Sequence, residues 1–112
     1  MSRITTHVLD VARGKPAAGV AVTLAAKADG SWRELATSST DEEGRAKYLL
    51  PEGPPPPAGT YRLRFETGPY FEGLGTTPFF PYVEVVFIVQ PGQHYHVPLL
   101  LSPFGYSTYR GT

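Results

Sequence analysis

Val20-Ala-Val-Thr-Leu-Ala-Ala26, followed by Asp29-Gly30, is the stretch that decides the fold class of this 112-residue chain. Its larger apolar side chains fall on every second position, which is the period of a β-strand with one buried face. An Asp-Gly pair after such a run indicates a tight hairpin, because both central residues of that turn need a positive φ. We therefore expect residues 20–26 and 31–37 to flank a hairpin turn as paired strands.

Short strands are predicted along the rest of the chain, separated by turns rich in glycine, proline and acidic residues. In residues 60–67, Tyr61, Leu63 and Phe65 alternate with charged residues, so that strand should bury one face and expose the other. Turns are expected at residues 40–44, 91–92 and 102–105. The remaining predicted strands are residues 4–9, 45–50, 79–90, 94–101 and 106–110.

Two segments do not fit a strand. Residues 51–59 contain five prolines, which predicts a surface loop, with a proline-rich recognition segment as the alternative. Residues 69–75 are the one place where a short helix is expected, because a proline stands at the start and a glycine at the end. Seven or eight short strands at regular spacing predict an all-β, two-sheet sandwich, with residues 1–112 as a single domain.

Charge and composition exclude several classes of protein. Ten basic residues balance ten acidic residues, so the chain lacks the positive charge of a nucleic-acid binder or a polybasic membrane-surface protein. The absence of cysteine excludes a disulfide scaffold, a thiolate zinc site and a cysteine nucleophile. The longest apolar run, residues 85–89, is far shorter than the roughly 20 residues of a membrane span. Without an apolar signal core in the first residues, we expect a cytoplasmic protein.

The chain has three histidines, and they are the main candidates for chemistry. His94 and His96 lie two residues apart in a predicted strand and so project from one face, which continues through Pro98 and Leu100. Together with His7, these imidazoles could activate a water and protonate a leaving group. A zinc site on the three histidines and purely structural imidazoles are the alternatives. Pro98 also predicts an edge strand or a locally interrupted ladder.

Arg45 and the chain end could add further polar groups to a site. Arg45 follows a turn glycine, and its guanidinium suits an anion or an oxyanion, with a solvated arginine as the alternative. The terminal Tyr109-Arg-Gly-Thr112 could bring a phenol, a guanidinium, a hydroxyl and the α-carboxylate to a pocket. A last edge strand with a loose tail is the other interpretation of that segment.

Together these residues resemble the 5-hydroxyisourate hydrolase family, the transthyretin-like enzymes of urate breakdown. The most specific matches are His94-Tyr-His-Val-Pro-Leu-Leu-Leu-Ser-Pro103 and Tyr109-Arg-Gly-Thr112. Two positions depart from the family pattern: the chain ends in threonine where the family usually has serine, and residues 40–43 replace an Asn-containing turn. Weaker matches at residues 4–10, 14–17, 44–45, 65–71 and 79–83 extend the resemblance over essentially the whole chain.

The resemblance implies a set of site residues. His7, Arg45 and His96 are the expected catalytic residues, with His94 outside that set. His7 and His96 would move protons, and Arg45 would hold an oxyanion or an enolate-like oxygen. No metal and no cofactor is expected, since water attack on an electron-poor ring carbonyl needs only positioning and charge stabilisation. The residues expected to bind substrate are His7, Arg45, Tyr109, Arg110, Gly111 and Thr112.

The resemblance also implies a fold, an assembly and a reaction. The family fold is a transthyretin-like sandwich of two four-stranded sheets with one short helix. The implied assembly is a homotetramer, a dimer of dimers with the active sites at the dimer–dimer interface. The implied reaction opens the ring of 5-hydroxyisourate to 2-oxo-4-hydroxy-4-carboxy-5-ureidoimidazoline. The alternatives are a non-enzymatic transthyretin-like binding protein and a zinc-dependent hydrolase built on the same histidines.

Overall fold

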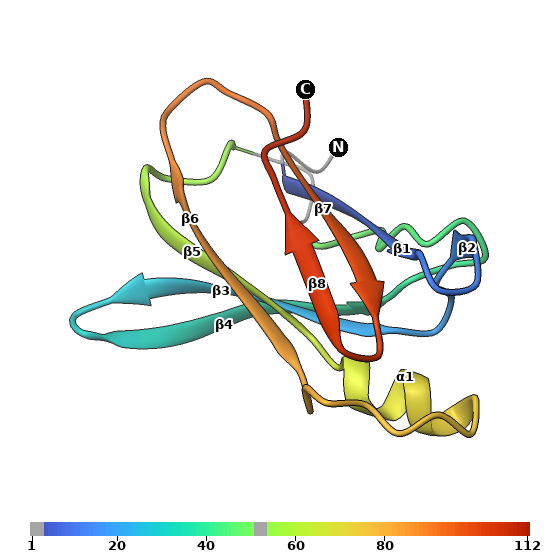
Figure 1. The fold of residues 1–112 in the computed structure, drawn as a ribbon. Coiled ribbons are helices and arrows are strands. Elements are labelled where there is room, and N and C mark those ends of the chain that lie inside the picture. The colour runs from blue at the N-terminus through green and yellow to red at the C-terminus, as the bar shows by residue number, and fades with distance from the viewer. Residues whose placement is uncertain (1–3, 51–53) are drawn as a thin grey trace.

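Two four-stranded sheets pack face to face in the computed structural model of the chain, which describes residues 4–50 and 54–112 (Figure 1). The strand orders are β2-β1-β7-β8 and β4-β3-β5-β6. These described residues confirm the predicted all-β sandwich with one short helix. The elements are β1 Ile4–Asp10, β2 Lys15–Pro16, β3 Ala21–Ala28, β4 Ser31–Ser39, β5 Gly59–Phe65, α1 Thr67–Gly73, β6 Val83–Val89, β7 Tyr95–Ser102 and β8 Gly105–Thr108.

The β3–β4 hairpin forms as the Asp-Gly pair predicts. Asp29 and Gly30 have φ angles of 51° and 79°, the positive values that a two-residue hairpin turn of this hand requires. Paired residues run along β3 from Ala21 to Ala28, so the hairpin is longer than its predicted strands. The turn residues therefore set the register between β3 and β4, two of the four strands of the second sheet.

The core fills the space between the sheets with side chains that alternate along the strands. Tyr61, Leu63 and Phe65 of β5 are buried, as predicted, and the residues between them are only partly covered. Truncating one such buried leucine or phenylalanine to alanine would cost roughly 2–5 kcal/mol. Side chains buried in full include Phe65, Ile4, Leu24, Leu49, Leu63, Leu99 and Leu101.

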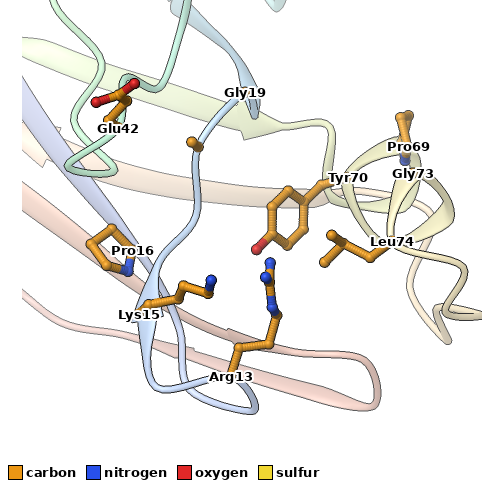
Figure 2. Close-up of a pocket in the computed structure, with 10 residues that line it drawn as sticks. Arg13, Lys15, Pro16, Gly19, Glu42, Pro69, Tyr70, Gly73 and Leu74 are labelled. Atoms are coloured by element: carbon orange, nitrogen blue, oxygen red, sulfur yellow. The ribbon is translucent and has the colours of Figure 1, made fainter.

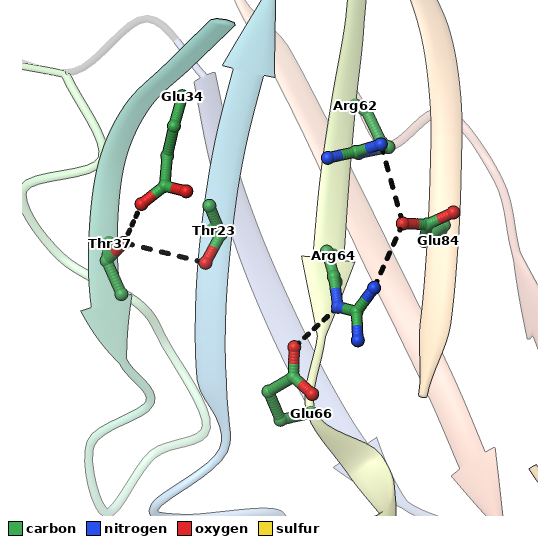
Figure 3. Close-up of polar contacts among 7 residues, drawn as sticks. All are labelled: Thr23, Glu34, Thr37, Arg62, Arg64, Glu66 and Glu84. Atoms are coloured by element: carbon green, nitrogen blue, oxygen red, sulfur yellow. Dashed lines mark hydrogen bonds and ion pairs between the residues drawn. The ribbon is translucent and has the colours of Figure 1, made fainter. Parts of the chain in front are cut away.

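Charged side chains cover part of the outer face of the second sheet (Figure 3). Arg64 Nε lies 2.7 Å from Glu66 Oε2, and Arg64 Nη1 lies 3.5 Å from Glu84 Oε2. Arg62 Nη1 reaches the same Glu84 oxygen at 3.5 Å, and the Arg62 guanidinium lies 4.7 Å from the centre of the Trp32 ring. Solvent-accessible ion pairs contribute about 0–1 kcal/mol each, so this face adds little to stability.

The strand predicted directly after the 40–44 turn does not form. Residues 45–50 make only isolated bridges, among them one between Arg45 and His7. Tyr48 then turns the chain with a φ of 64°. A positive φ lies outside the strand region, so no continuous ladder can run through this residue.

Other boundaries also differ from the prediction. The helix α1, Thr67–Gly73, begins two residues before the expected range 69–75. The strand β6 begins later than predicted, at Val83, after Pro81, which cannot donate to a ladder. The short β2, Lys15–Pro16, pairs with the end of β1 and has no clear signal in the sequence.

The strand β7 is an interior strand, so the edge position inferred from Pro98 is wrong. Pro98 lies opposite His7 in the parallel ladder with β1. On the other side, the regular ladder with β8 ends at Leu99, and Thr108 Oγ1 donates to the Pro98 carbonyl at 2.7 Å. The interrupted ladder, which the proline also predicts, is confirmed.

The proline-rich loop is confirmed for the part that can be described. Residues 51–53 lie outside the described residues, and residues 54–58 form an irregular connection before β5. The Tyr61 hydroxyl donates to the Pro57 carbonyl at 2.7 Å and so ties this connection to the sheet. Within the described ranges, no helix is long and apolar enough to cross a membrane.

Candidate active site

The parallel strands β1 and β7 in the middle of the first sheet place two of the predicted histidines side by side. Along β1, buried residues alternate with the half-buried Thr5, His7 and Leu9, which face outward. The register pairs Thr5 with His96 and His7 with Pro98. Because the outward positions of both strands coincide, His7 and His96 lie on one face of one sheet.

Arg45 reaches this face because the turn before it closes onto β1. The Val8 amide donates to the Gly44 carbonyl at 2.7 Å, and the Arg45 amide donates to Asp41 Oδ1 at 3.0 Å. The bond from the Arg45 amide is the main cause that lowers the pKa of the Asp41 carboxyl. A Cβ on Gly44 would lie 2.3 Å from the Val8 carbonyl oxygen, and Gly44 has a φ of 81°. Glycine is therefore required here for both space and conformation.

A backbone carbonyl fixes the tautomer of the neutral His7 ring. The His7 Nε2 atom lies 2.7 Å from the Glu43 carbonyl oxygen. A carbonyl oxygen can only accept, so Nε2 carries the proton and donates it. In the neutral imidazole the other nitrogen, Nδ1, then holds a lone pair. His7 is thus arranged as a proton acceptor.

Thr5, which no sequence motif points to, contacts two histidines. Its Oγ1 lies 2.8 Å from His96 Nδ1 and 3.3 Å from His94 Nε2. His94 precedes β7 and is exposed. The signal that could have found Thr5 is its spacing, since it stands two residues before His7 and shares the outward face of the strand.

His96 is placed so that its neutral form is favoured. Burial lowers the pKa of His96, and the charges of Arg45, His7 and His94 lower it further. Arg45 supplies the permanent positive charge of the group, because a guanidinium stays protonated. Its Nε lies 4.0 Å from Glu43 Oε1, and both side chains are more than half exposed, so this pair is weak. The guanidinium can therefore still bind an anion.

Two residues at the chain end, Arg110 and Gly111, contact opposite faces of the first sheet. The Gly111 amide donates to the His96 carbonyl at 2.8 Å, and a Cβ on Gly111 would lie 2.6 Å from His96 Cδ2. Arg110 instead donates to Gln93 Oε1 at 2.8 Å and lies 4.6 Å from the centre of the Tyr95 ring. Gly111 is thus brought to the histidines, whereas Arg110 lies toward the inward-facing Tyr95.

Tyr109, the predicted tyrosine of this segment, lies away from the histidines in this chain. Tyr109 is 60% exposed. With Arg110 and Tyr95 it lines a cavity of about 460 Å³ that also involves Phe87 of β6. None of His7, Arg45 and His96 lines that cavity.

Another hollow lies between the β1–β2 turn and α1 (Figure 2). It measures about 480 Å³, and Arg13, Lys15 and Tyr70 are among its lining residues. The Tyr70 hydroxyl donates to Asp10 Oδ2 at 2.7 Å, and Asp10 is 1% exposed. Burial, and then this contact, raise the pKa of Tyr70. The bond ties α1 to β1, which is a structural role.

The histidine contacts do not form a metal centre. Among residues 4–50 and 54–112, no group of three or more His, Cys, Asp or Glu side chains is placed to hold a metal ion. His7 binds a carbonyl, and His94 and His96 share one hydroxyl. What the arrangement can do is acid–base chemistry beside a fixed positive charge, which is the requirement for hydrolysis of an amide-like bond.

The chain is similar to known proteins over nearly its whole length. Residues 4–111 match the model of the HIUase/Transthyretin family. A 5-hydroxyisourate hydrolase of Salmonella dublin is 51% identical over 110 residues, 97% of this chain and 80% of that protein. The crystal structure of sea bream transthyretin in complex with thyroxine aligns with a TM-score of 0.89 and 39% identity, covering 98% of this chain and 95% of that one. The structure of Klebsiella pneumoniae 5-hydroxyisourate hydrolase aligns with a TM-score of 0.84 and 38% identity, covering 97% and 98%.

Proposed function

The chain belongs to the HIUase/transthyretin family, and we propose that it hydrolyses 5-hydroxyisourate in urate degradation at a site made of His7, Arg45 and His96. The observation that carries this proposal is that His7 and His96 lie on the outer face of β1 and β7, with the backbone of Arg45 bridged to His7. His7 contacts a backbone carbonyl, His96 contacts a hydroxyl, and the Arg45 amide donates to the Asp41 carboxylate. The similarity to two named 5-hydroxyisourate hydrolases supports the choice of substrate.

The reaction adds water across a C–N bond of the substrate ring. His7 Nδ1 accepts a proton from water as the water oxygen attacks the ring carbonyl carbon. Arg45 binds the negative charge that develops on the carbonyl oxygen, and His96 returns a proton to the leaving nitrogen. The product is 2-oxo-4-hydroxy-4-carboxy-5-ureidoimidazoline. Positioned acid–base groups contribute about 10²–10⁴-fold, and one oxyanion donor contributes about 10²–10³-fold.

The chain end completes the substrate site. Gly111 packs on His96, which supports a place for the neighbouring Thr112 in the substrate site. Tyr109 and Arg110 lie away from the site histidines within one chain, and their part in substrate binding is supported only by the family resemblance. The threonine keeps the hydroxyl that a terminal serine would offer, so the change from serine should alter the fit only slightly.

The active form is a homotetramer, a dimer of dimers, with the sites at the dimer–dimer interface. The supporting observation is that the catalytic residues lie on an open sheet face, where water would screen their charges. Val11 and Phe104 are 52% and 76% exposed, and both lie at the end of this sheet where β1 and β7 terminate. Covering that face with a second copy would bury these side chains and enclose the site.

The test is the near-ultraviolet decay of freshly generated 5-hydroxyisourate with and without the purified protein. We expect acceleration by the wild type, a loss of about 100-fold or more in H96A and R45A, and no effect of a strong chelator. R33A is the matched control for R45A, because Arg33 is an exposed arginine on β4 of the other sheet. Light scattering should give a tetramer, and F104E should lower both the assembly and the activity.

The same assay separates the hydrolase from a carrier. The likeness to a transthyretin in complex with thyroxine makes a non-enzymatic binding protein the second candidate. A folded tetramer that leaves the decay rate at its buffer value would overturn the hydrolase and favour the carrier. Activity that chelator removes and zinc restores would instead favour the zinc-dependent hydrolase.

A further inference from the structure

A single hydroxyl stands between two imidazoles at the back of the site. Thr5 Oγ1 is 2.8 Å from His96 Nδ1 and 3.3 Å from His94 Nε2. A threonine hydroxyl has one proton, so it can donate to only one of these nitrogens. Hydroxyl donors make shorter hydrogen bonds than N–H donors do. The two distances therefore fit a hydroxyl that donates to His96 and accepts from His94.

We propose that Thr5 is a positioning residue that, together with His94, holds His96 in its Nε2–H form and makes His96 the proton donor of the reaction. With Nδ1 accepting from Thr5, the proton of neutral His96 must lie on Nε2. Thr5 contacts Nδ1, and within the described residues Nε2 has no hydrogen-bond partner, so Nε2–H is free to act on substrate. This assignment rests on the proposed hydrolysis of 5-hydroxyisourate and adds to it the division of roles between the histidines.

His7 is held in the opposite tautomer, so one histidine is the proton acceptor and the other is the proton donor. His7 donates Nε2–H to the Glu43 carbonyl at 2.7 Å and keeps a lone pair on Nδ1. His96 accepts at Nδ1 and keeps its proton on Nε2. Two neutral imidazoles with opposite tautomers thus offer one acceptor and one donor. A base and an acid are available together without either ring being charged.

The proton that His96 gives up is replaced through the same hydrogen bonds. As the C–N bond breaks, His96 Nε2–H passes its proton to the leaving nitrogen, and the Thr5 hydroxyl proton moves to His96 Nδ1. Thr5 Oγ1 takes the proton of His94 Nε2, and the exposed His94 takes one from solvent at Nδ1. His7 meanwhile releases to solvent the proton taken from the attacking water. One water is consumed, and the protein's proton count is unchanged. The reverse transfer, in which solvent protonates His96 Nε2 and His94 Nδ1 releases a proton to solvent, restores the starting tautomers before the next turnover.

The charges around His96 explain why a relay is needed. Arg45 comes from the turn beside β1, His7 lies on β1, and His94 precedes β7. Burial lowers the pKa of His96, and repulsion from Arg45, and from His7 and His94 whenever they are protonated, lowers it further, so an imidazolium there is disfavoured. A neutral donor needs its proton replaced as it leaves. The exposed His94, farther from the reacting bond, can take up that proton from solvent.

The experiment removes the hydroxyl and keeps the shape of the side chain. T5V lacks the hydroxyl and T5S retains it, while T23V makes the same change at a half-buried threonine on the outer face of β3. We expect T5V to lower kcat by at least about tenfold, a part of what a positioned proton donor contributes, with KM little changed. T5S and T23V should stay within about threefold of wild type. H94F should lower kcat in the same direction as T5V.

Nitrogen NMR of the imidazoles gives a readout that a merely structural role would not move. Wild type and T5S should show His96 as the Nε2–H tautomer, and T5V should show a mixture or the Nδ1–H form. The pKa of His96, followed by the same NMR signals in a pH titration, should rise in T5V, because Thr5 stabilises the neutral ring. Wild-type kcat in T5V, or a His96 that carries its proton on Nδ1 in the wild type, would overturn the inference. An inactive wild type would instead overturn the proposed function.

Discussion

Replacing Gly44 by alanine is the sharpest test of how the site is built. The new Cβ would lie 2.3 Å from the Val8 carbonyl oxygen and 3.2 Å from His7 Cδ2. Because the nearer atom belongs to the backbone of an interior strand, the methyl group fits only if the turn moves away from β1. That movement breaks the 2.7 Å bond from the Val8 amide to the Gly44 carbonyl and carries Arg45 away from His7.

The expected magnitude follows from two contributions. A side chain in the left-handed conformation that Gly44 adopts, with φ of 81°, costs about 1–2 kcal/mol. Losing the Val8 hydrogen bond costs about 0.5–1.5 kcal/mol more. We expect the free energy of unfolding to fall by about 1.5–3.5 kcal/mol. Because Arg45 is displaced, kcat/KM should fall by about 100-fold or more, as for loss of an oxyanion donor.

The matched control is G30A. Gly30 has a φ of 79°, and a Cβ there would meet nothing within 4 Å, so only the conformational cost of about 1–2 kcal/mol applies. Urea unfolding at a fixed protein concentration measures stability, and the decay of 5-hydroxyisourate measures activity. If G44A is as stable as G30A and retains wild-type kcat/KM, then closure of this turn onto β1 does not position Arg45.

Four further outcomes are expected. R45Q should raise the pKa of His96 in an NMR titration, since burial and then the Arg45 charge hold it below 6.5 in the folded chain. His96 therefore binds protons more readily in the unfolded chain than in the folded chain. The free energy of unfolding of the wild type should decline as the pH falls below about 6.5, and an increase in that range would contradict the prediction. Y70F should cost about 1.5–3 kcal/mol in urea unfolding, because the buried Asp10 carboxylate loses a donor. E84Q should cost less than about 1 kcal/mol, and a larger loss would show that its ion pairs matter more than their exposure suggests.

Local patterns were enough to predict most strands. The alternation in β5 specifies which side chains enter the core, because successive side chains of a strand point to opposite faces. The Asp29-Gly30 pair specifies the β3–β4 turn, because few other residues adopt two successive positive φ angles. Both signals depend only on residues within a few positions of one another.

The errors arose where contacts between distant segments decide the conformation. Residues 45–50 contain apolar and β-compatible residues, yet they bridge β1 and then turn at Tyr48 instead of joining a sheet. Pro98 allowed either an edge strand or an interrupted ladder, and only the fold could show that the interrupted ladder is the one formed. A proline excludes one hydrogen bond but does not say which strands lie on either side.

For the candidate site, the sequence by itself determined the chemical groups and the strand faces that carry them. It placed His7 on one strand, His94 and His96 at another, and Arg45 after a glycine turn, and the resemblance linked them. The alternation along each strand already set Thr5 and His7 on one face.

Only the tertiary structure decided how these groups meet. Parallel pairing of β1 with β7 sets Thr5 opposite His96, and the closure of the Gly44 turn gives His7 the Glu43 carbonyl. These contacts fix which ring nitrogen carries a proton and so determine which imidazole can accept and which can donate. The physical reason is that a tautomer depends on the partner across the hydrogen bond. Here that partner comes from a distant part of the chain, whose register is set by packing of the whole core.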